Sequence, residues 1–156
     1  QGTLFCEWEN QGLEADTIII AVGGGGLISG AISWFQKRKK IVAVEPENCP
    51  TLNVALKKGK PSNVSVSGIA ASALGAKVIG DICFGLSKEH QLESLVVSDD
   101  EIKKAQKILW EYHRIFVEPA GATALAAIIF GKYKPKANEK LGILICGANP
   151  NIIPEF

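Results

Sequence analysis

The sequence predicts an α/β fold in which a mostly parallel sheet lies between two layers of helices. This three-layer α/β/α arrangement is expected to form a single domain over residues 1–156. Short β-branched runs alternate along the chain with stretches whose apolar residues recur at helical spacing. Alternating strands and helices are typical of parallel sheets that are covered on both faces. Apolar residue types make up 47% of the chain, which is enough to build the core that such a fold requires.

Five elements are expected in the first sixty residues. β-branched runs indicate buried strands, and apolar positions three and four residues apart indicate helices. Pro46 stops the second strand, and Gly59 stands just past the third helix, where glycine is favoured. The expected helices span residues 2–13, 27–37 and 51–58, and the expected strands span residues 16–22 and 40–46.

The second half of the chain is less regular. Residues 61–68 form a polar loop, and residues 69–84 have a mixed pattern, interrupted by glycines, that predicts no single element. Ser98 and Glu101 have the spacing of a capping box and predict the start of a helix. The other expected elements are a strand over residues 92–97, an Ala-rich helix from Pro119 to about Gly131, and a strand over residues 141–145.

Four consecutive glycines stand between the first strand and its helix. Glycines let backbone N–H groups converge on an anion, and the start of a helix adds its positive end. A tight turn without a ligand is the alternative, but such turns rarely need four glycines, each of which is costly in conformational entropy. We therefore expect this loop to bind a phosphate. Its residues are Gly23, Gly24, Gly25, Gly26 and Leu27.

Several kinds of phosphate ligand fit a glycine-rich loop. A nucleotide P-loop is excluded, because no Gly-Lys-Ser/Thr follows the glycines. A dinucleotide site would use an acidic residue at the end of the next strand, where Glu45 stands, but Ser29 occupies the position of the third glycine. Two interpretations are left: the loop binds a phosphorylated cofactor, or the chain is a non-catalytic module that binds a nucleotide or a metabolite.

Four short motifs follow one another along the chain: Gly-Gly-Gly-Gly-Leu at residues 23–27, Val-Glu-Pro at 44–46, Glu-Pro-Ala-Gly-Ala at 118–122 and Cys-Gly-Ala-Asn at 146–149. In order and spacing they resemble the fold-type II pyridoxal-phosphate enzymes, and within them the threonine/serine dehydratase branch that includes serine racemase. The resemblance covers essentially the whole chain. It implies that residues 1–156 are the C-terminal portion of the large domain that binds pyridoxal 5'-phosphate (PLP).

The resemblance implies which residues bind this cofactor. The backbone amides of residues 23–27 would hold its phosphate. Cys146 matches the family position that faces the pyridine nitrogen. A neutral thiol there stabilises a protonated ring less than a carboxylate would, which favours β-elimination over transamination. A small buried residue at a strand end is the alternative for Cys146. Gly68 resembles a family glycine near the cofactor ring.

Two carboxylates also match family positions. Glu118 matches a Glu near the cofactor ring that could assist catalysis, and its alternative role is a helix N-terminal charge before Pro119. Glu45 matches a divalent-cation ligand of serine-racemase-like members. Thr51 stands where the second carboxylate of that metal site would be, so the alternative for Glu45 is a strand-end cap.

The implied function is that of a PLP-dependent L-threonine/L-serine dehydratase, an ammonia-lyase that eliminates water from an amino-acid substrate and yields a 2-oxo acid and ammonia. A serine racemase is the alternative within the family. The family's Schiff-base lysine motif does not occur here, and no Lys precedes Gly23. We therefore expect the catalytic lysine and a small domain to lie in other parts of a parent enzyme, and this chain alone to be inactive.

Charge and composition argue against other classes of partner. The 17 basic and 16 acidic residues give a formal net charge of +1, which does not favour nucleic acid. No apolar run is long enough to span a membrane. The four cysteines lack paired metal-ligand spacing, so we expect a reducing, cytoplasmic environment. We also expect a homo-oligomer, because an incomplete sheet leaves an apolar edge exposed.

Overall fold

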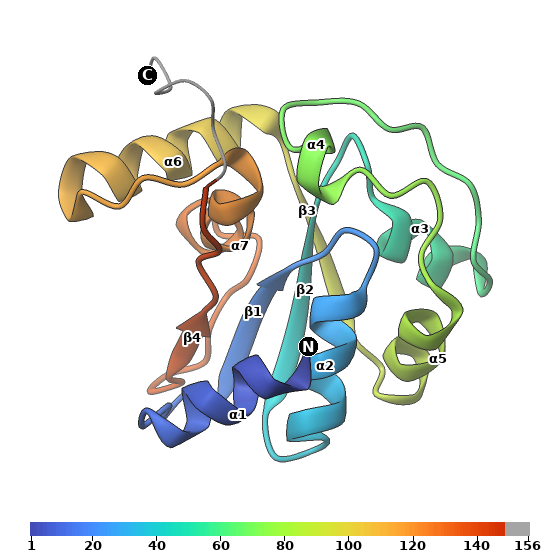
Figure 1. Ribbon diagram of the computed structural model, residues 1–156, viewed down its shortest axis with the longest axis horizontal. Helices are drawn as coiled ribbons and strands as arrows, with labels where there is room; N and C mark the ends of the chain where they lie inside the picture. The colour runs from blue at the N-terminus through green and yellow to red at the C-terminus, as the bar shows by residue number, and fades with distance from the viewer. Residues whose placement is uncertain (149–156) are drawn as a thin grey trace.

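The structure, a computed structural model, describes residues 1–148. Its centre is a four-stranded sheet with the order β3-β2-β1-β4, and all three strand pairs are parallel. Figure 1 shows helices in front of this sheet and behind it, as the α/β/α expectation requires. The strands are β1 (Thr17–Ala21), β2 (Lys40–Pro46), β3 (Glu93–Val97) and β4 (Leu141–Ile143). The helices are α1 (Gly2–Asn10), α2 (Gly26–Phe35), α3 (Thr51–Lys58), α4 (Ala71–Leu74), α5 (Asp81–Glu89), α6 (Asp99–His113) and α7 (Pro119–Ile129).

Strand β1 is buried along its whole length. It pairs with β2 on one side and with β4 on the other, so both of its backbone edges are hydrogen-bonded. Ile18 and Ile20 contribute to one hydrophobic layer, whereas Ile19 contributes to the opposite one. Because parallel strands run in one direction, the end of β1 and the loop after it lie at the carboxyl edge of the sheet.

One face of the sheet is covered by α1, α2, α3 and α5. The rings of Phe5 in α1 and Phe35 in α2 meet edge to face, with their centroids 5.7 Å apart. Both side chains are fully buried beneath Ile18 and Ile20. Replacing such a ring with Ala typically costs about 3–5 kcal/mol, so this contact helps to hold α1 and α2 together on this face of the sheet.

The other face is covered by α6 and α7. Helix α7 is rich in alanine, and seven of its eleven residues are buried, which lets it lie close to β1 and β2. Helix α6 starts with the expected capping box: the Glu101 N–H donates to Ser98 Oγ (3.3 Å), and the Ser98 N–H donates to the Glu101 carboxylate (2.8 Å). Contacts between two residues close in the sequence, Ser98 and Glu101, therefore set the boundary between β3 and α6.

The sequence did not indicate α4 and α5, which occupy most of residues 71–89. Helix α4 has only four residues, too few for a helical period to show. Helix α5 contains Gly85 and leaves Ile82 77% exposed, so its apolar pattern is weak. Strand β4 is also shorter than expected. Among residues 1–148, no helix is long and apolar enough to cross a bilayer.

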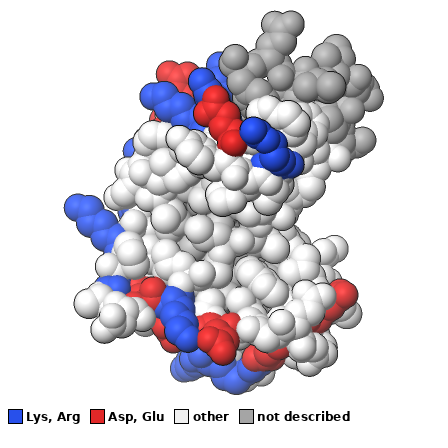
Figure 2. All heavy atoms as spheres, turned by 90° about the vertical axis from the view of Figure 1, so that its left-hand side faces the viewer, with Lys and Arg blue, Asp and Glu red and all other residues white. Residues whose placement is uncertain are grey.

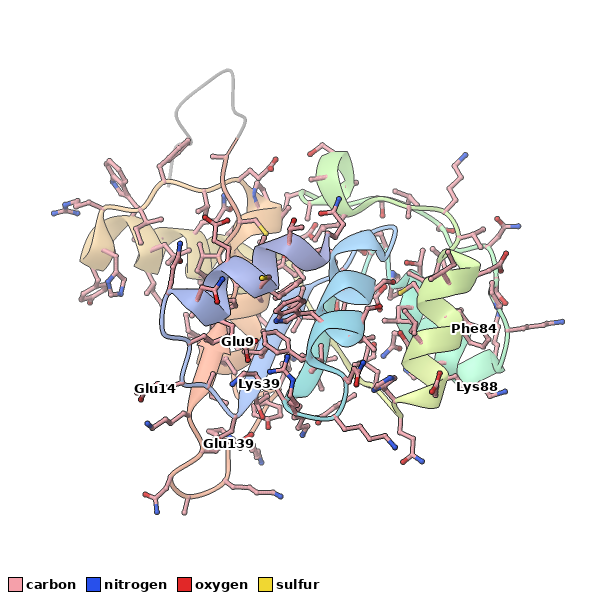
Figure 3. All side chains as sticks on the ribbon, turned by 60° about the horizontal axis from the view of Figure 1, so that its bottom comes forward. Glu9, Glu14, Lys39, Phe84, Lys88 and Glu139 are labelled. Carbon is pink, nitrogen blue, oxygen red and sulfur yellow. The ribbon has the colours of Figure 1, made fainter. Side chains whose placement is uncertain are left out.

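Glu139 ties the turn before β4 to the amino end of β1 (Figure 3). Its carboxylate accepts hydrogen bonds from the Thr17 hydroxyl (2.5 Å), the Tyr133 hydroxyl (2.5 Å) and the Lys136 N–H (2.7 Å). The bond from Thr17, followed by those from Tyr133 and Lys136, lowers the pKa of Glu139 to about 2. Because its pKa is lower in the folded state than the ordinary value, the carboxylate contributes stability above about pH 4.5 that is lost as the pH falls towards 2.

We expect Glu139→Gln to lower the melting temperature by a few degrees at neutral pH, because an amide accepts these bonds less strongly than a carboxylate. The difference between the variant and the wild type should shrink between pH 4.5 and pH 2, where the wild-type carboxylate takes up its proton. Thermal melts followed by circular dichroism across this pH range would test it. A difference that stays constant with pH would contradict the assignment.

Candidate active site

The glycine loop joins β1 to α2 and turns at Gly25. The φ angle of Gly25 is 93°, in the left-handed region that favours glycine. Gly25 is also the N-cap of α2, and no side chain of the described residues caps this end. The first N–H groups of a helix have no partner within the helix. The loop therefore presents backbone donors and the positive end of α2 at the carboxyl edge of the sheet, which suits an anion.

The glycines of this loop serve different purposes. A Cβ on Gly23 would lie 2.9 Å from the Cα of Leu74, and a Cβ on Gly25 would lie 2.5 Å from the Sγ of Cys83. A Cβ on Gly24, in contrast, would meet no described atom within 4 Å. Packing within the protein thus accounts for glycine at positions 23 and 25. At position 24 the space is open, as expected where a ligand approaches the backbone.

The loop borders a pocket of about 260 Å³. Residues from three distant parts of the chain complete its wall: α4, the start of α7 and the segment after β4. Glu118 and Cys146, both expected at this edge from the sequence, lie in the wall together with the loop. The lining residues are Ala21, Val22, Gly23, Gly24, Gly25, Gly26, Leu27, Ile28, Ala73, Leu74, Glu118, Ala120 and Cys146.

Close backbone packing brings Cys146 to the pocket. A Cβ on Gly121, in the first turn of α7, would lie 2.6 Å from the carbonyl oxygen of Cys146. The small residues of α7 thus let another backbone segment approach closely. Burial, and then the negative charge of Glu118, raise the pKa of the Cys146 thiol. Cys146 therefore presents a neutral S–H to the pocket at neutral pH.

Glu118 lies at the start of α7 and also lines the pocket. It is the N-cap of α7, followed by Pro119 at the first helical position, yet its side chain makes no capping hydrogen bond among the described residues. Its backbone is held instead, since the Glu118 N–H donates to the carbonyl of Gly147 (3.4 Å). The carboxylate is thus left on the pocket wall, where it can accept a hydrogen bond from a ligand.

Glu45 is fully buried and does not line this pocket. Its two carboxylate oxygens accept hydrogen bonds from the backbone N–H groups of Leu52 and Asn53, both 2.7 Å long. Burial raises the pKa of Glu45 to about 7, although those N–H groups act in the opposite direction. Within residues 1–148, no group of three or more His, Cys, Asp or Glu side chains could hold a metal ion.

Gly68 also lies outside the pocket lining. Its φ of 88° favours glycine, and a Cβ there would lie 2.8 Å from both carboxylate oxygens of Asp99. These two facts account for glycine at this position without a ligand. A role for Gly68 in cofactor binding stays a prediction.

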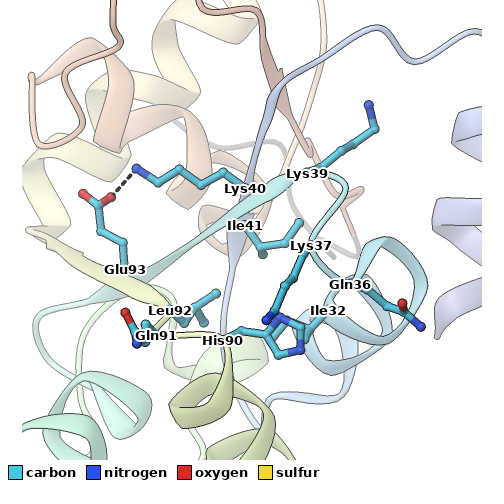
Figure 4. Close-up of a pocket in the computed structure, with 10 residues that line it drawn as sticks. All are labelled: Ile32, Gln36, Lys37, Lys39, Lys40, Ile41, His90, Gln91, Leu92 and Glu93. Carbon is cyan, nitrogen blue, oxygen red and sulfur yellow. Dashed lines mark ion pairs between the residues drawn. The ribbon is translucent and has the colours of Figure 1, made fainter.

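A second, larger pocket of about 480 Å³ lies near the amino ends of β2 and β3 (Figure 4). It is lined by several lysines, but two of them are already engaged. Lys40 forms an ion pair with Glu93 (2.7 Å), and the Lys39 ammonium donates to the carbonyl of Ala15 (2.7 Å). Because the amino ends of parallel strands lie opposite their carboxyl ends, this pocket is separate from the glycine loop.

The sequence indicated the loop, Glu118 and Cys146, but it missed other parts of the wall. Ala73 and Leu74 close the pocket from α4, in the stretch that predicted no element. Thr51 was considered only as a vacant metal-ligand position, yet its hydroxyl lies 3.3 Å from the carbonyl oxygen of Gly23. A buried threonine at the start of a helix that follows a buried acidic residue was the available signal for this contact.

Comparisons with known proteins point to one family. The profile described as "Pyridoxal-phosphate dependent enzyme" matches residues 1–147. The biosynthetic L-threonine dehydratase IlvA of Salmonella typhimurium is 37% identical over 157 residues, which cover 97% of this chain and 30% of the relative. Serine racemase of Dictyostelium discoideum is 34% identical over 164 residues, which cover 97% of this chain and 48% of the relative.

Solved structures agree with the sequence comparisons. The crystal structure of the Dictyostelium discoideum serine racemase matches with a TM-score of 0.85 and 35% identity, over 97% of this chain and 49% of that one. Maize serine racemase matches with a TM-score of 0.87 and 30% identity, over 97% of this chain and 48% of that one. The chain thus spans about half the length of these racemases and about a third of the dehydratase.

The two glycines at positions 24 and 25 should respond differently to substitution. Gly25→Ala should lower the free energy of unfolding by about 2–3 kcal/mol, because the methyl group meets Cys83 and the φ angle is positive. Gly24→Ala should change it by less than about 0.5 kcal/mol, since the space there is open. Urea denaturation of the three proteins would measure both values. Equal losses at the two positions would show that the loop packs differently.

Proposed function

The chain belongs to the family of pyridoxal-phosphate-dependent enzymes, and from that premise we propose that it forms the phosphate- and pyridine-binding part of an L-threonine/L-serine dehydratase. Such a lyase eliminates water from the amino acid and yields a 2-oxo acid and ammonia. The observation that carries the proposal is the convergence of the glycine loop, Glu118 and Cys146 on one pocket. The similarity to threonine dehydratases over 97% of the chain supports it.

Residues of this pocket fit PLP. The backbone N–H groups of the loop and the positive end of α2 would bind the phosphate, and the open space beside Gly24 leaves room for it. The neutral thiol of Cys146 would face the pyridine nitrogen without imposing a negative charge on it. When bound, PLP supplies an electron sink for the bond changes at the Cα of the substrate.

Glu118 would act as an auxiliary group in this pocket. Its carboxylate stands on the wall beside the loop and lacks a capping bond within the described chain. In that position it can hold or accept a proton near the bound substrate. We assign the proton transfer at Cα to a lysine outside this pocket wall, because no lysine is among the residues that line it.

Serine racemase is the second candidate within the family. The observation in its favour is the structural match to two serine racemases, with TM-scores of 0.85 and 0.87. The two activities differ in their products from L-serine: a dehydratase forms pyruvate and a racemase forms D-serine. A non-catalytic nucleotide- or metabolite-binding module is the candidate from another class, and it would bind a nucleotide in preference to PLP.

We further propose that residues 1–156 are the C-terminal portion of the large PLP-binding domain of a cytoplasmic homo-oligomer. This chain covers only 30–48% of the length of the two relatives, which supports its assignment as one part of a larger enzyme. Strand β4 has three residues and forms an edge of the sheet. Figure 2 shows the face on that side of the molecule, with charged side chains gathered at its two ends and few over its middle. An uncharged face beside a sheet edge is suited to contact with further protein.

The phosphate site is tested by comparing PLP with pyridoxal, which lacks the phosphate, in isothermal titration calorimetry of the 156-residue chain. PLP should bind at least about tenfold more tightly, because hydrogen bonds to a charged group contribute about 1.5–3 kcal/mol. Gly24→Ala should remove most of this preference while keeping the fold. Equal affinity for PLP and pyridoxal, or tighter binding of a dinucleotide, would rule out the proposed site.

The catalytic part of the proposal is tested by product analysis. The complete protein that carries this chain should convert L-threonine to 2-oxobutanoate in the presence of PLP. The 156-residue chain alone should form none, because no lysine lines its pocket. D-serine as the main product from L-serine would favour the racemase, and turnover by the chain alone would contradict the assignment of the lysine to another segment.

A further inference from the structure

Glu45 is a fully buried carboxylate without an ion-pair partner among the described residues. It lies in β2, beside the start of α3. Four groups donate hydrogen bonds to it: the backbone N–H groups of Leu52 and Asn53 (both 2.7 Å), the Thr51 hydroxyl (3.2 Å) and the Ser94 hydroxyl (3.4 Å). A buried carboxylate is costly unless it is hydrogen-bonded in this way.

These contacts make Glu45 the cap of α3. The N-cap position of α3 is Pro50, which offers no side-chain acceptor. The first N–H groups of the helix instead find their acceptor in the neighbouring strand, at the two oxygens of Glu45. The positive end of the helix further favours negative charge at this position. A carboxylate from β2 thus takes over the capping role that a Ser, Thr or Asp side chain usually fills.

The same contacts do not fit a divalent cation at Glu45. Mg²⁺ and Ca²⁺ require several oxygen ligands with lone pairs directed at the ion. Both oxygens of Glu45 already accept short bonds from backbone N–H groups, and Thr51 stands where the resemblance would require a second carboxylate.

Thr51 links this cap to the glycine loop. It is fully buried, and its single hydroxyl proton is shared between two acceptors, the carbonyl oxygen of Gly23 (3.3 Å from Oγ) and the Glu45 carboxylate (3.2 Å from Oγ). The carbonyl of Gly23 belongs to the peptide whose N–H is that of Gly24. A bond to this carbonyl therefore restricts the rotation of the peptide plane that orients the Gly24 N–H towards the pocket.

We propose that Glu45 and Thr51 are positioning residues that hold the phosphate-binding loop in place without a metal ion. Glu45 fixes the first turn of α3, and Thr51, carried by that turn, fixes the peptide between Gly23 and Gly24. This inference rests on the proposed PLP site, because the orientation of the Gly24 N–H matters only for an anion bound there. It also explains why β2, which does not line the pocket, contains a buried acid beside it.

The test compares three buried-threonine variants in the 156-residue chain. Thr51→Val keeps the shape of the side chain but removes its hydroxyl, and Thr51→Ser keeps the hydroxyl. Thr17→Val is the matched control: Thr17 is 1% exposed and its hydroxyl also bonds to a glutamate, but it lies at the amino end of β1, away from the loop. Affinities for PLP and for pyridoxal are measured by calorimetry.

Thr51→Val should lower the affinity for PLP about fivefold, which is the contribution of about one hydrogen bond. It should change the affinity for pyridoxal by less than twofold. Thr51→Ser should bind both ligands within twofold of the wild type. Thr17→Val should lower the melting temperature without changing the ratio of the two affinities. The proposal is overturned if Thr51→Val lowers the affinities for PLP and pyridoxal by the same factor. It is also overturned if Thr17→Val changes the ratio of the two affinities as much as Thr51→Val does.

A second measurement needs no cofactor. In ¹H–¹⁵N spectra of the free chain, the Gly24 amide resonance should shift in Thr51→Val and stay in place in Thr17→Val, because a bond to a carbonyl alters the shift of the following amide nitrogen. An unshifted Gly24 resonance in Thr51→Val would overturn the positioning role. If the wild type does not distinguish PLP from pyridoxal but this resonance shifts, the proposed PLP site fails and the contact between Thr51 and the loop stands.

The metal-free character of the cap is tested with the same chain. Melting temperature and PLP affinity should be the same in EDTA, in Mg²⁺ and in Ca²⁺. At pH 8 and above, where Glu45 (pKa about 7) is ionised, Glu45→Gln should lower the melting temperature, because its amide turns a donor towards one of the two backbone N–H groups of α3. An increase in melting temperature or PLP affinity on adding either cation would overturn the metal-free part of the proposal, and Thr51→Val keeps the test valid should Glu45→Gln fail to fold.

Discussion

The pairing of β1 with β2 is the constraint on which the rest of the molecule depends. Both strands are apolar and buried, and their parallel register, Thr17 with Lys40 through Ala21 with Val44, makes them end at the same edge of the sheet. One strand then leads into the glycine loop, and the other carries the carboxylate that caps α3. A slip of one residue would exchange the two faces of β1 and separate these features.

The two layers of helices contribute differently to the pocket. On one face, large apolar side chains of α2, among them Ile28 and Phe35, pack into the core between this helix and the sheet. On the other face, α7 uses small residues, and Gly121 lets the backbone of Cys146 approach closely. Large apolar side chains hold α2 against the sheet, whereas small ones admit the segment after β4 that carries the thiol. The pocket lies where the two modes of packing meet.

The sequence predicted most of this arrangement, and the reasons for its failures are physical. The strands are apolar on both faces and several helices begin or end with local signals, as Ser98 and Gly59 illustrate, so most bounds could be predicted to within a few residues. The first helix ends at Asn10 and not at residue 13, and β4 ends at Ile143 and not at residue 145. The family inferred from four motifs is confirmed by the profile match over residues 1–147. Helices α4 and α5 are too short or too weakly amphipathic to give a pattern, and the contact between Thr51 and Gly23 joins residues 28 positions apart.

The surroundings of Glu45 show how backbone N–H groups can hold a buried carboxylate at the start of a helix. A metal ion bound at this place would hold the start of α3 through its ligands, but Thr51 and Pro50 provide neither a second carboxylate nor a side-chain cap. The backbone N–H groups of α3 then become the available partners for a buried carboxylate, and they satisfy it with two 2.7 Å bonds. Since the threonine hydroxyl also reaches Gly23, Thr51 adds a direct link between the start of α3 and the glycine loop.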